Sequence, residues 1–199
     1  MSSKQIHYNM DNIEKENATF NIIFGEKSNG KSYQVKHKRG IENYLKTGNR
    51  FILLRRWRED LSNLWVEQYF ADVDVEKLTE GKFKTIIVYR KTLYFANITP
   101  EGKIIKGDKI GYVMALSTEQ HYSGGSFLDV SDIIFEEYQE RGSYIKNEEE
   151  RLEYLYSTVD RKRGTTRVWM VGNAVSKVNP YVQGWKLDSI FKSIKQRRN

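Results

Sequence analysis

Short, almost wholly apolar runs alternate with longer amphipathic stretches along most of this 199-residue chain. Such short runs are typical of strands that are buried on both faces, as in a parallel sheet. One amphipathic stretch begins at Lys31 and ends near Gly48, and another follows Asn147 with three glutamates in its first turn, which predicts two helices. We therefore predict an α/β fold with a largely parallel central sheet flanked by helices. The strands are expected at residues 19–24, 51–54, 133–135 and 168–171.

The pattern changes to alternation typical of strands over residues about 83–116, where turn signals separate three further runs. This region is predicted to be an antiparallel β-meander inserted in the βα scaffold. Residues 117–131 and 139–147 are expected to be loops. The whole chain, 1–199, is predicted to be a single domain, with an irregular leading segment at 1–17 and a basic terminal helix at 186–199.

Composition narrows the class of protein without choosing a function. The chain is 39% hydrophobic and 30% charged, which is typical of a globular domain. It has no apolar run of about 18 residues, so no membrane partner is expected. Zero cysteines exclude a disulfide framework and a thiolate metal site, in agreement with a reducing cytoplasm. A net charge of +7 makes a polyanionic partner possible and does not by itself identify one.

The segment from Gly25 to Ser32 fits the P-loop pattern GxxxxGK[ST] at every fixed position. A predicted strand precedes it and a predicted helix follows, so successive backbone N–H groups would surround a polyphosphate. Lys31 would reach the β- and γ-phosphates, and the Ser32 hydroxyl would bind Mg²⁺. The alternative is a chance match in a surface loop. The sequence thus predicts ATP and Mg²⁺ as cofactors, with nucleotide-binding residues Gly25, Glu26, Lys27, Ser28, Asn29, Gly30, Lys31, Ser32 and Tyr33.

A second motif is the pair of carboxylates, Glu136 and Glu137, at the end of the apolar run 133–135. A hard cation prefers oxygen ligands, and an attacking water needs an oriented base. We therefore assign Glu136 to Mg²⁺ and Glu137 to the water. The alternative is a solvated acidic loop.

Polar residues at two other element ends could also act on the phosphates. We favour Arg161 as a candidate arginine finger, with Arg163 as the alternative. Cations at a helix C-terminus are favourable with the helix dipole alone, which is the alternative reading. Asn173 follows the last apolar run and could sense the γ-phosphate, although Gly-Asn is also good turn chemistry.

These motifs together resemble the ATPase domain of the DNA encapsidation (genome packaging) ATPases of small tailed phages with protein-primed genomes. The resemblance runs from about residue 19 to 182. Its most specific part is Thr158-Val159-Asp160-Arg161 followed by Asn173-Ala174-Val175-Ser176 and Val178-Asn179-Pro180-Tyr181. The other matching pieces are Phe24-Gly25 with Gly30-Lys31-Ser32-Tyr33, Phe51-Ile52 with Arg55-Arg56, and the acidic strand end.

The resemblance implies an ASCE-type P-loop fold, with the catalytic glutamate on a strand next to the P-loop strand. It implies a homomeric ring, usually of five subunits, on the portal of a procapsid in the host cell cytoplasm. ATP hydrolysis would drive double-stranded DNA into the shell. Whether a scaffold RNA is a further partner is left open. By position, Lys31 and Ser32 are the Walker A residues, Glu137 is the catalytic glutamate and Arg161 acts in trans. Arg58 falls where the family has a basic residue near the subunit interface.

Two departures from the family pattern affect these expectations. The family usually has Asp at the position of Glu136, so the metal would be held through water or at a shifted distance. Family members are also longer, with a nuclease-like second domain. DNA contacts are expected on pore loops at 118–127 and 139–147, which could equally be plain connectors. The candidates are Gln120, His121, Tyr122, Ser123, Arg141, Ser143, Tyr144 and Lys146.

The leading prediction is therefore an ATP-driven DNA translocase. One alternative is a P-loop kinase or another monomeric nucleotide-dependent enzyme, although the sequence shows no clear lid. Another is a nucleotide-gated assembly module that does not cycle, and the paired carboxylates argue against it.

Overall fold

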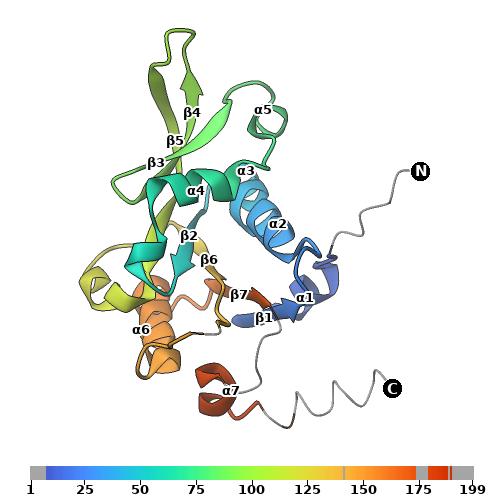
Figure 1. The fold of residues 1–199 in the computed structure, drawn as a ribbon, viewed down its shortest axis with the longest axis vertical. Coiled ribbons are helices and arrows are strands. Elements are labelled where there is room, and N and C mark those ends of the chain that lie inside the picture. The colour runs from blue at the N-terminus through green and yellow to red at the C-terminus, as the bar shows by residue number, and fades with distance from the viewer. Residues whose placement is uncertain (1–7, 141, 174–178, 188, 190–199) are drawn as a thin grey trace.

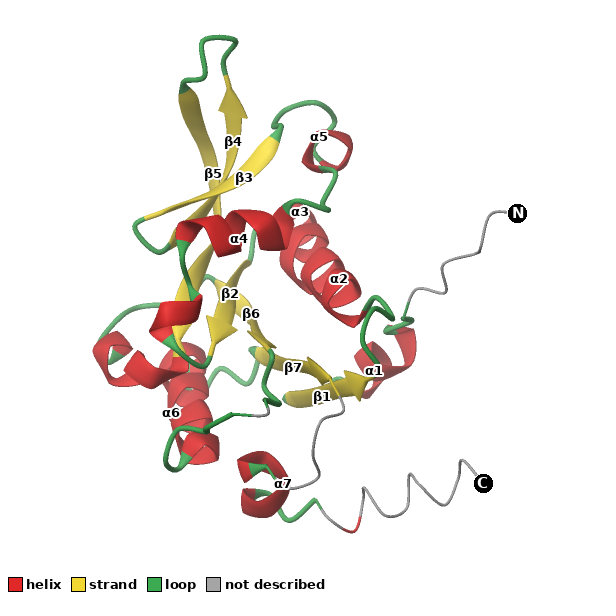
Figure 2. Cartoon of the chain, in the orientation of Figure 1, coloured by secondary structure: helices red, strands yellow, loops and turns green. Residues whose placement is uncertain are grey.

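The computed structural model describes residues 8–140, 142–173, 179–187 and 189. Within them, helices pack on both faces of the central part of one seven-stranded sheet (Figures 1 and 2). The strands are β1 Phe20–Gly25, β2 Arg50–Arg55, β3 Thr85–Tyr89, β4 Thr92–Ile98, β5 Ile104–Ala115, β6 Val130–Glu136 and β7 Arg167–Asn173. The α-helices are α1 Asp11–Glu16, α2 Lys31–Val35, α3 Asn43–Thr47, α4 Asn63–Phe70, α5 Val75–Leu78, α6 Glu148–Asp160 and α7 Pro180–Gly184. A π-helical segment, η1 Lys36–Glu42, joins α2 to α3, and η2 Arg58–Asp60 and η3 Leu116–Tyr122 are 3₁₀ helices.

The sheet has the order β1-β7-β6-β2-β5-β4-β3. The pairs β1–β7, β7–β6, β6–β2 and β2–β5 are parallel, which confirms the predicted parallel core. One expectation is wrong: β7 lies between the P-loop strand β1 and the acidic strand β6, so those two strands are not neighbours. In this register Gly25 pairs with Asn173, and Glu136 pairs with Val171. The C-terminal ends of β1, β6 and β7 therefore lie at one edge of the sheet.

The predicted meander exists, but it is not a separate insertion. Strands β3, β4 and β5 pair in antiparallel order, and they form an arm that projects from the rest of the molecule (Figure 1). The twelve-residue strand β5 belongs to both parts. Its residues from Ile104 to Tyr112 pair with β4, and those from Gly111 to Ala115 pair with β2. The arm thus continues the central sheet.

Apolar side chains fill both faces of the sheet, which explains why its strands are almost wholly apolar. Side chains alternate along β2, so that Phe51 and Leu53 join one buried cluster and Ile52 and Leu54 join the other. The first cluster includes Val35 and Ile41 from the helix after the P-loop, and also α4 residues. The second cluster is covered by α6 and α7, which contribute Leu152, Leu155, Val159 and Tyr181 to it.

The helix after the P-loop runs without a break from Lys31 to Thr47 and ends at Gly48, as predicted. Gly48 has φ 75°, a left-handed conformation that glycine adopts without steric cost. The middle of the helix is π-helical over Lys36–Glu42. Gly40 in this segment lies close to the Phe51 ring. A Cβ added at Gly40 would be 3.4 Å from Phe51 Cζ. The helix therefore packs closely on β2.

Two predicted segments differ in the structure, the leading segment and the loop 117–131. The leading segment is not irregular throughout, because Asp11–Glu16 form α1 and Met10 is fully buried. The expected loop 117–131 begins as the 3₁₀ helix η3, since the chain packs on α6 there. The predicted basic terminal helix lies mostly outside the described residues, as do residues 1–7 of the leading segment. Among the residues that the structure describes, no helix is long and apolar enough to cross a membrane.

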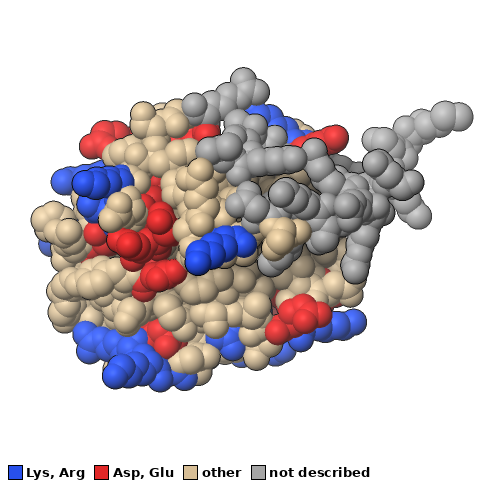
Figure 3. All heavy atoms as spheres, turned by 90° about the horizontal axis from the view of Figure 1, so that it is seen from below, with Lys and Arg blue, Asp and Glu red and all other residues tan. Residues whose placement is uncertain are grey.

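Charge is mixed on the face seen in Figure 3. The main group of acidic side chains lies left of the centre, other acidic side chains lie near the edges, and Lys and Arg side chains lie in several separate groups. Among the residues described, the basic charge on this face is therefore not collected into one patch. The net charge of +7 alone does not locate a DNA-binding surface here.

Candidate nucleotide-binding site

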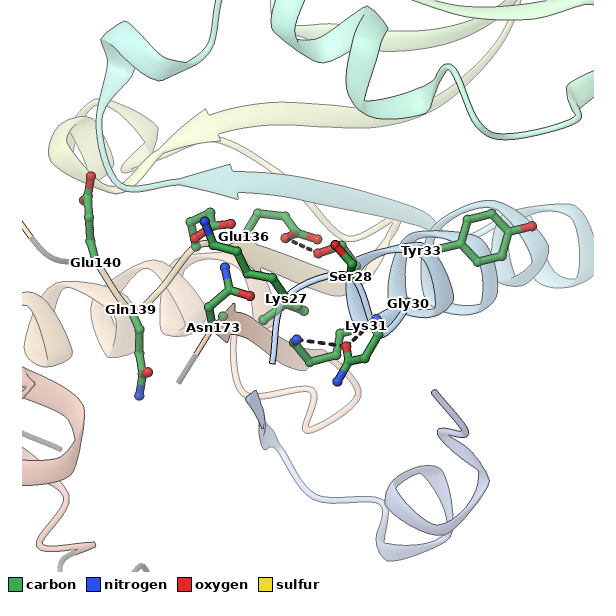
Figure 4. A pocket seen from close by; sticks show the side chains of 14 residues that line it. Lys27, Ser28, Gly30, Lys31, Tyr33, Glu136, Gln139, Glu140 and Asn173 are labelled. Atoms are coloured by element: carbon green, nitrogen blue, oxygen red, sulfur yellow. Dashed lines mark hydrogen bonds between the residues drawn. The ribbon is translucent and has the colours of Figure 1, made fainter. Parts of the chain in front are cut away.

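A cavity of about 620 Å³ opens at the edge of the sheet where β1, β6 and β7 end (Figure 4). It brings together the P-loop, the acidic strand end and the last core strand, which lie far apart in the sequence. The volume is within the range of small-ligand sites. The lining residues are Lys27, Ser28, Asn29, Gly30, Lys31, Ser32, Tyr33, Glu136, Glu137, Gln139, Glu140, Val171, Gly172 and Asn173.

The P-loop turns sharply between β1 and α2. Ser28 and Gly30 have positive φ values of 60° and 81°. Gly25 and Glu26 do not line the cavity and instead shape the start of the loop. A Cβ at Gly25 would lie 3.1 Å from Asn29 Nδ2, so a larger residue there would press on the loop. The remaining seven predicted nucleotide-binding residues all line the cavity.

Lys31 is buried inside the loop that it belongs to. Its Nζ donates to the carbonyl of Glu26 at 2.5 Å and to Asn29 Oδ1 at 2.9 Å. Burial lowers the pKa of the Lys31 ammonium, while Glu137 and Glu136 oppose that change. The loop's own oxygens therefore hold the cation at the cavity wall.

Glu136 is buried below the P-loop, and both of its oxygens accept hydrogen bonds. Ser32 Oγ donates to Oε2 at 2.9 Å, and Tyr69 Oη donates to Oε1 at 2.7 Å. Burial raises the pKa of Glu136, and the hydrogen bonds from Tyr69 and Ser32 oppose the rise. Burial and the adjacent carboxylate hold the pKa of Tyr69 well above its usual range, so its hydroxyl remains a donor. Sequence reasoning missed Tyr69, because it belongs to no motif and has the spacing of a core residue of α4.

Glu137 is exposed and lines the same cavity one residue after β6. Its φ of 56° is left-handed, so the chain turns sharply there. Gln139 and Glu140, in the loop 139–147 that was predicted as a candidate for DNA contact, also line the cavity. The segment 137–140 is thus part of the site.

A buried arginine at the end of β2 fixes this segment. Arg56 Nη2 donates to the carbonyl of Tyr138 at 2.6 Å, and Nη1 donates to Glu140 Oε2 at 2.7 Å and to the carbonyl of Glu137 at 3.3 Å. The same guanidinium binds Glu148 at the start of α6. The positive charge of Arg56 is therefore buried and paired.

Asn173 ends β7 and lines the cavity, and it pairs in the sheet with Gly25, the first residue of the P-loop. The preceding Gly172 has a structural reason to be glycine. A Cβ there would lie 2.9 Å from the ring of Tyr138, which is closer than such contacts allow. Backbone of β7 and the segment after β6 consequently pack in direct contact.

The oxygen donors at Ser32 and Glu136 fit a magnesium ion. Within the described part of the chain, no group of three or more His, Cys, Asp or Glu side chains is arranged to hold a metal. Mg²⁺ usually takes only one or two protein oxygens, and keeps waters and phosphate oxygens as its other ligands. A site with so few protein oxygens suits that cation.

Comparison with known proteins identifies the family. Residues 2–198 match the podovirus DNA encapsidation protein (Gp16) family. The chain belongs to this family. It is 31% identical over 181 residues to the DNA packaging protein of Bacillus phage phi29, which covers 89% of this chain and 49% of that protein. The DNA packaging protein of Bacillus phage B103 is 32% identical over 164 residues, with 81% and 46% covered. The Gp16-family chain thus spans about half the length of these relatives.

Solved structures share the fold. The crystal structure of the N-terminal domain of the DNA packaging ATPase from bacteriophage phi29 matches with a TM-score of 0.73 and 30% identity, over 90% of this chain and 86% of that one. A chain of the Phi-29 viral genome packaging motor assembly matches with a TM-score of 0.71 and 29% identity, over 91% and 51%. The predicted ASCE-type P-loop fold is confirmed.

The two candidate finger arginines of this Gp16-family chain lie away from the cavity. They follow α6, whose 13 residues span about 20 Å and begin beside Arg56. Arg163 donates to several backbone carbonyls, including those of Leu128 at 2.8 Å and Val130 at 3.1 Å, and is held in the fold. Arg161 is exposed, and its guanidinium donates to the carbonyl of Gly125 at 2.5 Å. The geometry favours Arg161 over Arg163 as a group that could reach another molecule.

The predicted DNA-contact residues divide into two groups. Gln120, His121, Ser123, Ser143 and Lys146 are exposed, and so is the interface candidate Arg58. Tyr122 and Tyr144 are partly buried, and each contacts other residues of its own chain. Tyr122 Oη accepts from the Ala115 N–H at 3.1 Å, and the Tyr144 ring lies 4.6 Å from the Arg56 guanidinium. Arg141 lies outside the described residues.

Proposed function

We propose that this chain is the ATP-hydrolysing motor domain of a phage DNA packaging machine. The observation that carries the proposal is the cavity in which the P-loop, the Glu136–Glu137 pair and Asn173 meet. Family membership supports the packaging role, since the family is described by DNA encapsidation. The phi29 domain of similar fold is described as a DNA packaging ATPase.

The P-loop would hold the triphosphate of ATP. The left-handed turns at Ser28 and Gly30 would direct backbone N–H groups toward the phosphate oxygens, at the positive end of the long helix that starts at Lys31. On binding, phosphate oxygens would replace the carbonyl of Glu26 and Asn29 Oδ1 as partners of the Lys31 ammonium. Asn173 would contact the γ-phosphate from β7.

Ser32 and Glu136 would hold Mg²⁺, which supplies charge neutralisation at the phosphates when bound. Because the Ser32 hydroxyl donates a hydrogen bond to Glu136, the lone pairs of Ser32 Oγ remain available for the cation. Glu136 then acts through Ser32 and through water.

Glu137 would orient and deprotonate the attacking water. It is the exposed carboxylate of the pair and lines the cavity, whereas Glu136 is buried and doubly hydrogen-bonded. Segment 137–140 is fixed by Arg56, so the base has a defined position. General-base assistance of this kind typically contributes about 10²–10⁴-fold to a rate.

Arg161 would complete the site of a neighbouring copy. It lies about the length of α6 away from the cavity of its own chain, and its guanidinium is exposed. An arginine supplied in trans requires a homomeric ring, and we propose a pentamer with Arg58 near the interface. Arginine fingers are worth about 10³–10⁵ in rate.

The ring would translocate double-stranded DNA into a procapsid through its portal, in the host cell cytoplasm, with a scaffold RNA as a further partner. The exposed residues Gln120, His121, Ser123, Ser143 and Lys146 are the DNA-contact candidates. The alignments cover about half of each of these longer relatives.

The test is steady-state ATPase activity against protein concentration for wild type, Glu137→Gln, Arg161→Ala and an equimolar mixture of these two variants. We expect a cooperative rise for wild type, and at least about a 100-fold loss for each variant alone. The mixture should recover part of the activity, because a Glu137→Gln subunit can lend Arg161 to an intact carboxylate in its neighbour.

Lys162→Ala is the matched control, since Lys162 is an exposed cation next to Arg161. Its activity should stay near wild type. Activity that is linear in concentration, with Arg161→Ala near wild type, would reject the trans-acting ring and favour a monomeric enzyme such as a P-loop kinase. ATP binding with no turnover in wild type would favour an assembly module.

A further inference from the structure

Tyr69 joins the metal side of the site from outside the P-loop and strand motifs. It lies on α4, and its hydroxyl donates to Glu136 Oε1 at 2.7 Å. Ser32 Oγ donates to the other oxygen, Oε2. The two donors come from different helices, so the carboxylate is held from two directions and its plane is fixed.

The Tyr69 ring is itself held by two neighbours. Trp65, one turn earlier on α4, stacks on it with ring centroids 5.4 Å apart. The Lys36 ammonium lies 4.5 Å from the centre of the Tyr69 ring and also donates to the Tyr69 carbonyl and to Asp72. Lys36 is one turn after Ser32 on the helix that follows the P-loop, so this helix carries both the metal-binding hydroxyl and the anchor of Tyr69.

Glu136 needs such support more than a shorter residue would. A glutamate has one more rotatable bond than an aspartate. Each unrestrained side-chain torsion lets the carboxylate move out of the position in which it can act on the metal site. Two hydrogen bonds to opposite oxygens remove that freedom. Tyr69 therefore has a task that follows from the length of the Glu136 side chain.

We infer that Tyr69 is a positioning residue for the Mg²⁺-ATP site, which fixes the Glu136 carboxylate for its contacts with Ser32 and metal-bound water. This inference rests on the proposed nucleotide-binding function of the cavity. It extends the site to α4, an element that precedes the arm and contains no nucleotide-binding motif.

The experiment measures the affinity of a fluorescent ATP analogue as Mg²⁺ is titrated from zero, with EDTA defining the metal-free point. The proteins are wild type, Tyr69→Phe, Glu136→Asp, the double variant and Tyr44→Phe. Tyr44→Phe is the matched control, because Tyr44 packs against Phe95 on β4 and does not line the cavity.

Tyr69→Phe should leave the affinity in EDTA within about twofold of wild type, and raise the half-maximal Mg²⁺ concentration by about three- to tenfold. Loss of a hydrogen bond to a charged group typically changes an equilibrium constant by about a factor of ten or more. Part of this loss should appear as weaker Mg²⁺ binding. Glu136→Asp withdraws the carboxylate from Tyr69, so adding Tyr69→Phe to it should have less effect than in wild type. Tyr44→Phe should match wild type at every Mg²⁺ concentration.

The outcomes separate the two proposals. Mg²⁺-dependent nucleotide binding in wild type, with an unchanged Mg²⁺ response in Tyr69→Phe, would overturn the role of Tyr69 and leave the nucleotide site intact. Equal losses in EDTA and in Mg²⁺ would also overturn it, because they indicate general damage to the cavity. Absence of Mg²⁺-dependent binding in wild type would reject the proposed function and this inference together. If Tyr69→Phe fails to fold, additive effects of Glu136→Asp and Tyr69→Trp would overturn the coupling, and non-additive effects would support it.

Discussion

The guanidinium of Arg56 binds both carboxylate oxygens of Glu148, with 2.7 Å from Nε to Oε2 and 2.9 Å from Nη2 to Oε1. Both side chains are buried. Tyr181 Oη and the Ile145 N–H also donate to Glu148, at 2.6 and 2.9 Å. One buried ion pair thus joins β2, the segment after β6, α6 and α7.

Removing one partner of this pair should be costly. Arg56→Met leaves the Glu148 charge buried and unpaired, so we expect the free energy of unfolding to fall by about 3–5 kcal/mol. Urea denaturation measures this. Adding Glu148→Leu should recover part of the loss, because both charges are then gone. Arg58→Met, at an exposed arginine two residues away, should change stability by less than about 0.5 kcal/mol.

Asp160 predicts a pH-dependent contribution to stability. Burial alone would raise its pKa, but hydrogen bonds from the N–H groups of Thr166, Gly164 and Thr165 outweigh burial and lower the pKa. A lowered folded-state pKa stabilises the fold above the unfolded value of about 3.9, and this stabilisation is lost as pH falls through the folded value. Asp160→Asn should therefore cost about 1–2 kcal/mol at pH 7.

The cost of Asp160→Asn should shrink as pH falls below about 4, as measured by urea denaturation across pH. Asp108→Asn is the control, since its ion pair with Lys82 is exposed and should contribute less than about 1 kcal/mol. A loss for Asp160→Asn that is the same at pH 3 and pH 7 would show that the charge of Asp160 does not matter.

Gly172→Ala should impair the candidate site more than it harms the fold elsewhere. The new Cβ would press on the Tyr138 ring at 2.9 Å and displace the segment that carries Glu137. We expect a loss of about 1–3 kcal/mol in stability, together with a fall in ATP turnover that exceeds any fall in ATP affinity. Gly142→Ala, three residues from Gln139 and with no heavy atom closer than 3.9 Å to the added Cβ, should be neutral in both assays.

Lys146→Ala should weaken DNA binding without changing basal ATP hydrolysis. Lys146 is exposed just before α6. If it contacts a phosphate, the slope of log affinity against log salt should fall by about one. Fluorescence anisotropy with a DNA duplex over a range of salt concentrations measures this slope. Lys15→Ala on α1 is the control, and equal slopes for Lys146→Ala and wild type would remove Lys146 from the DNA surface.

Much of the fold could be predicted because its signals are local. The buried strands, the helix from Lys31 to Thr47 and the glycine at its end follow from side-chain periodicity and backbone preference. Strand order is not local, and the position of β7 between β1 and β6 was therefore missed. The helical leading segment was missed because Met10, buried in the core, looks like any isolated apolar residue in the sequence.

The candidate site divides in the same way. The P-loop and the two glutamates could be found because their chemistry requires fixed spacing along the chain. Tyr69, Gln139 and Glu140 reach the site or its carboxylate only through tertiary packing, so no spacing marks them. The sequence alone does not show which of Arg161 and Arg163 is available to another molecule. The structure distinguishes them, because Arg163 donates to backbone carbonyls of its own chain.

The pairing of β5 with both β4 and β2 has a consequence for how the protein unfolds. Because Tyr112 and Gly111 pair with both β4 and β2, the arm and the core share a backbone segment without a hinge between them. Cutting out the arm would strip the neighbour from β2, so it cannot be removed or grafted as an independent module. The arm and the parallel sheet should then melt in one cooperative step, and a load applied at the hairpin tip would be carried along a single strand to the middle of the molecule.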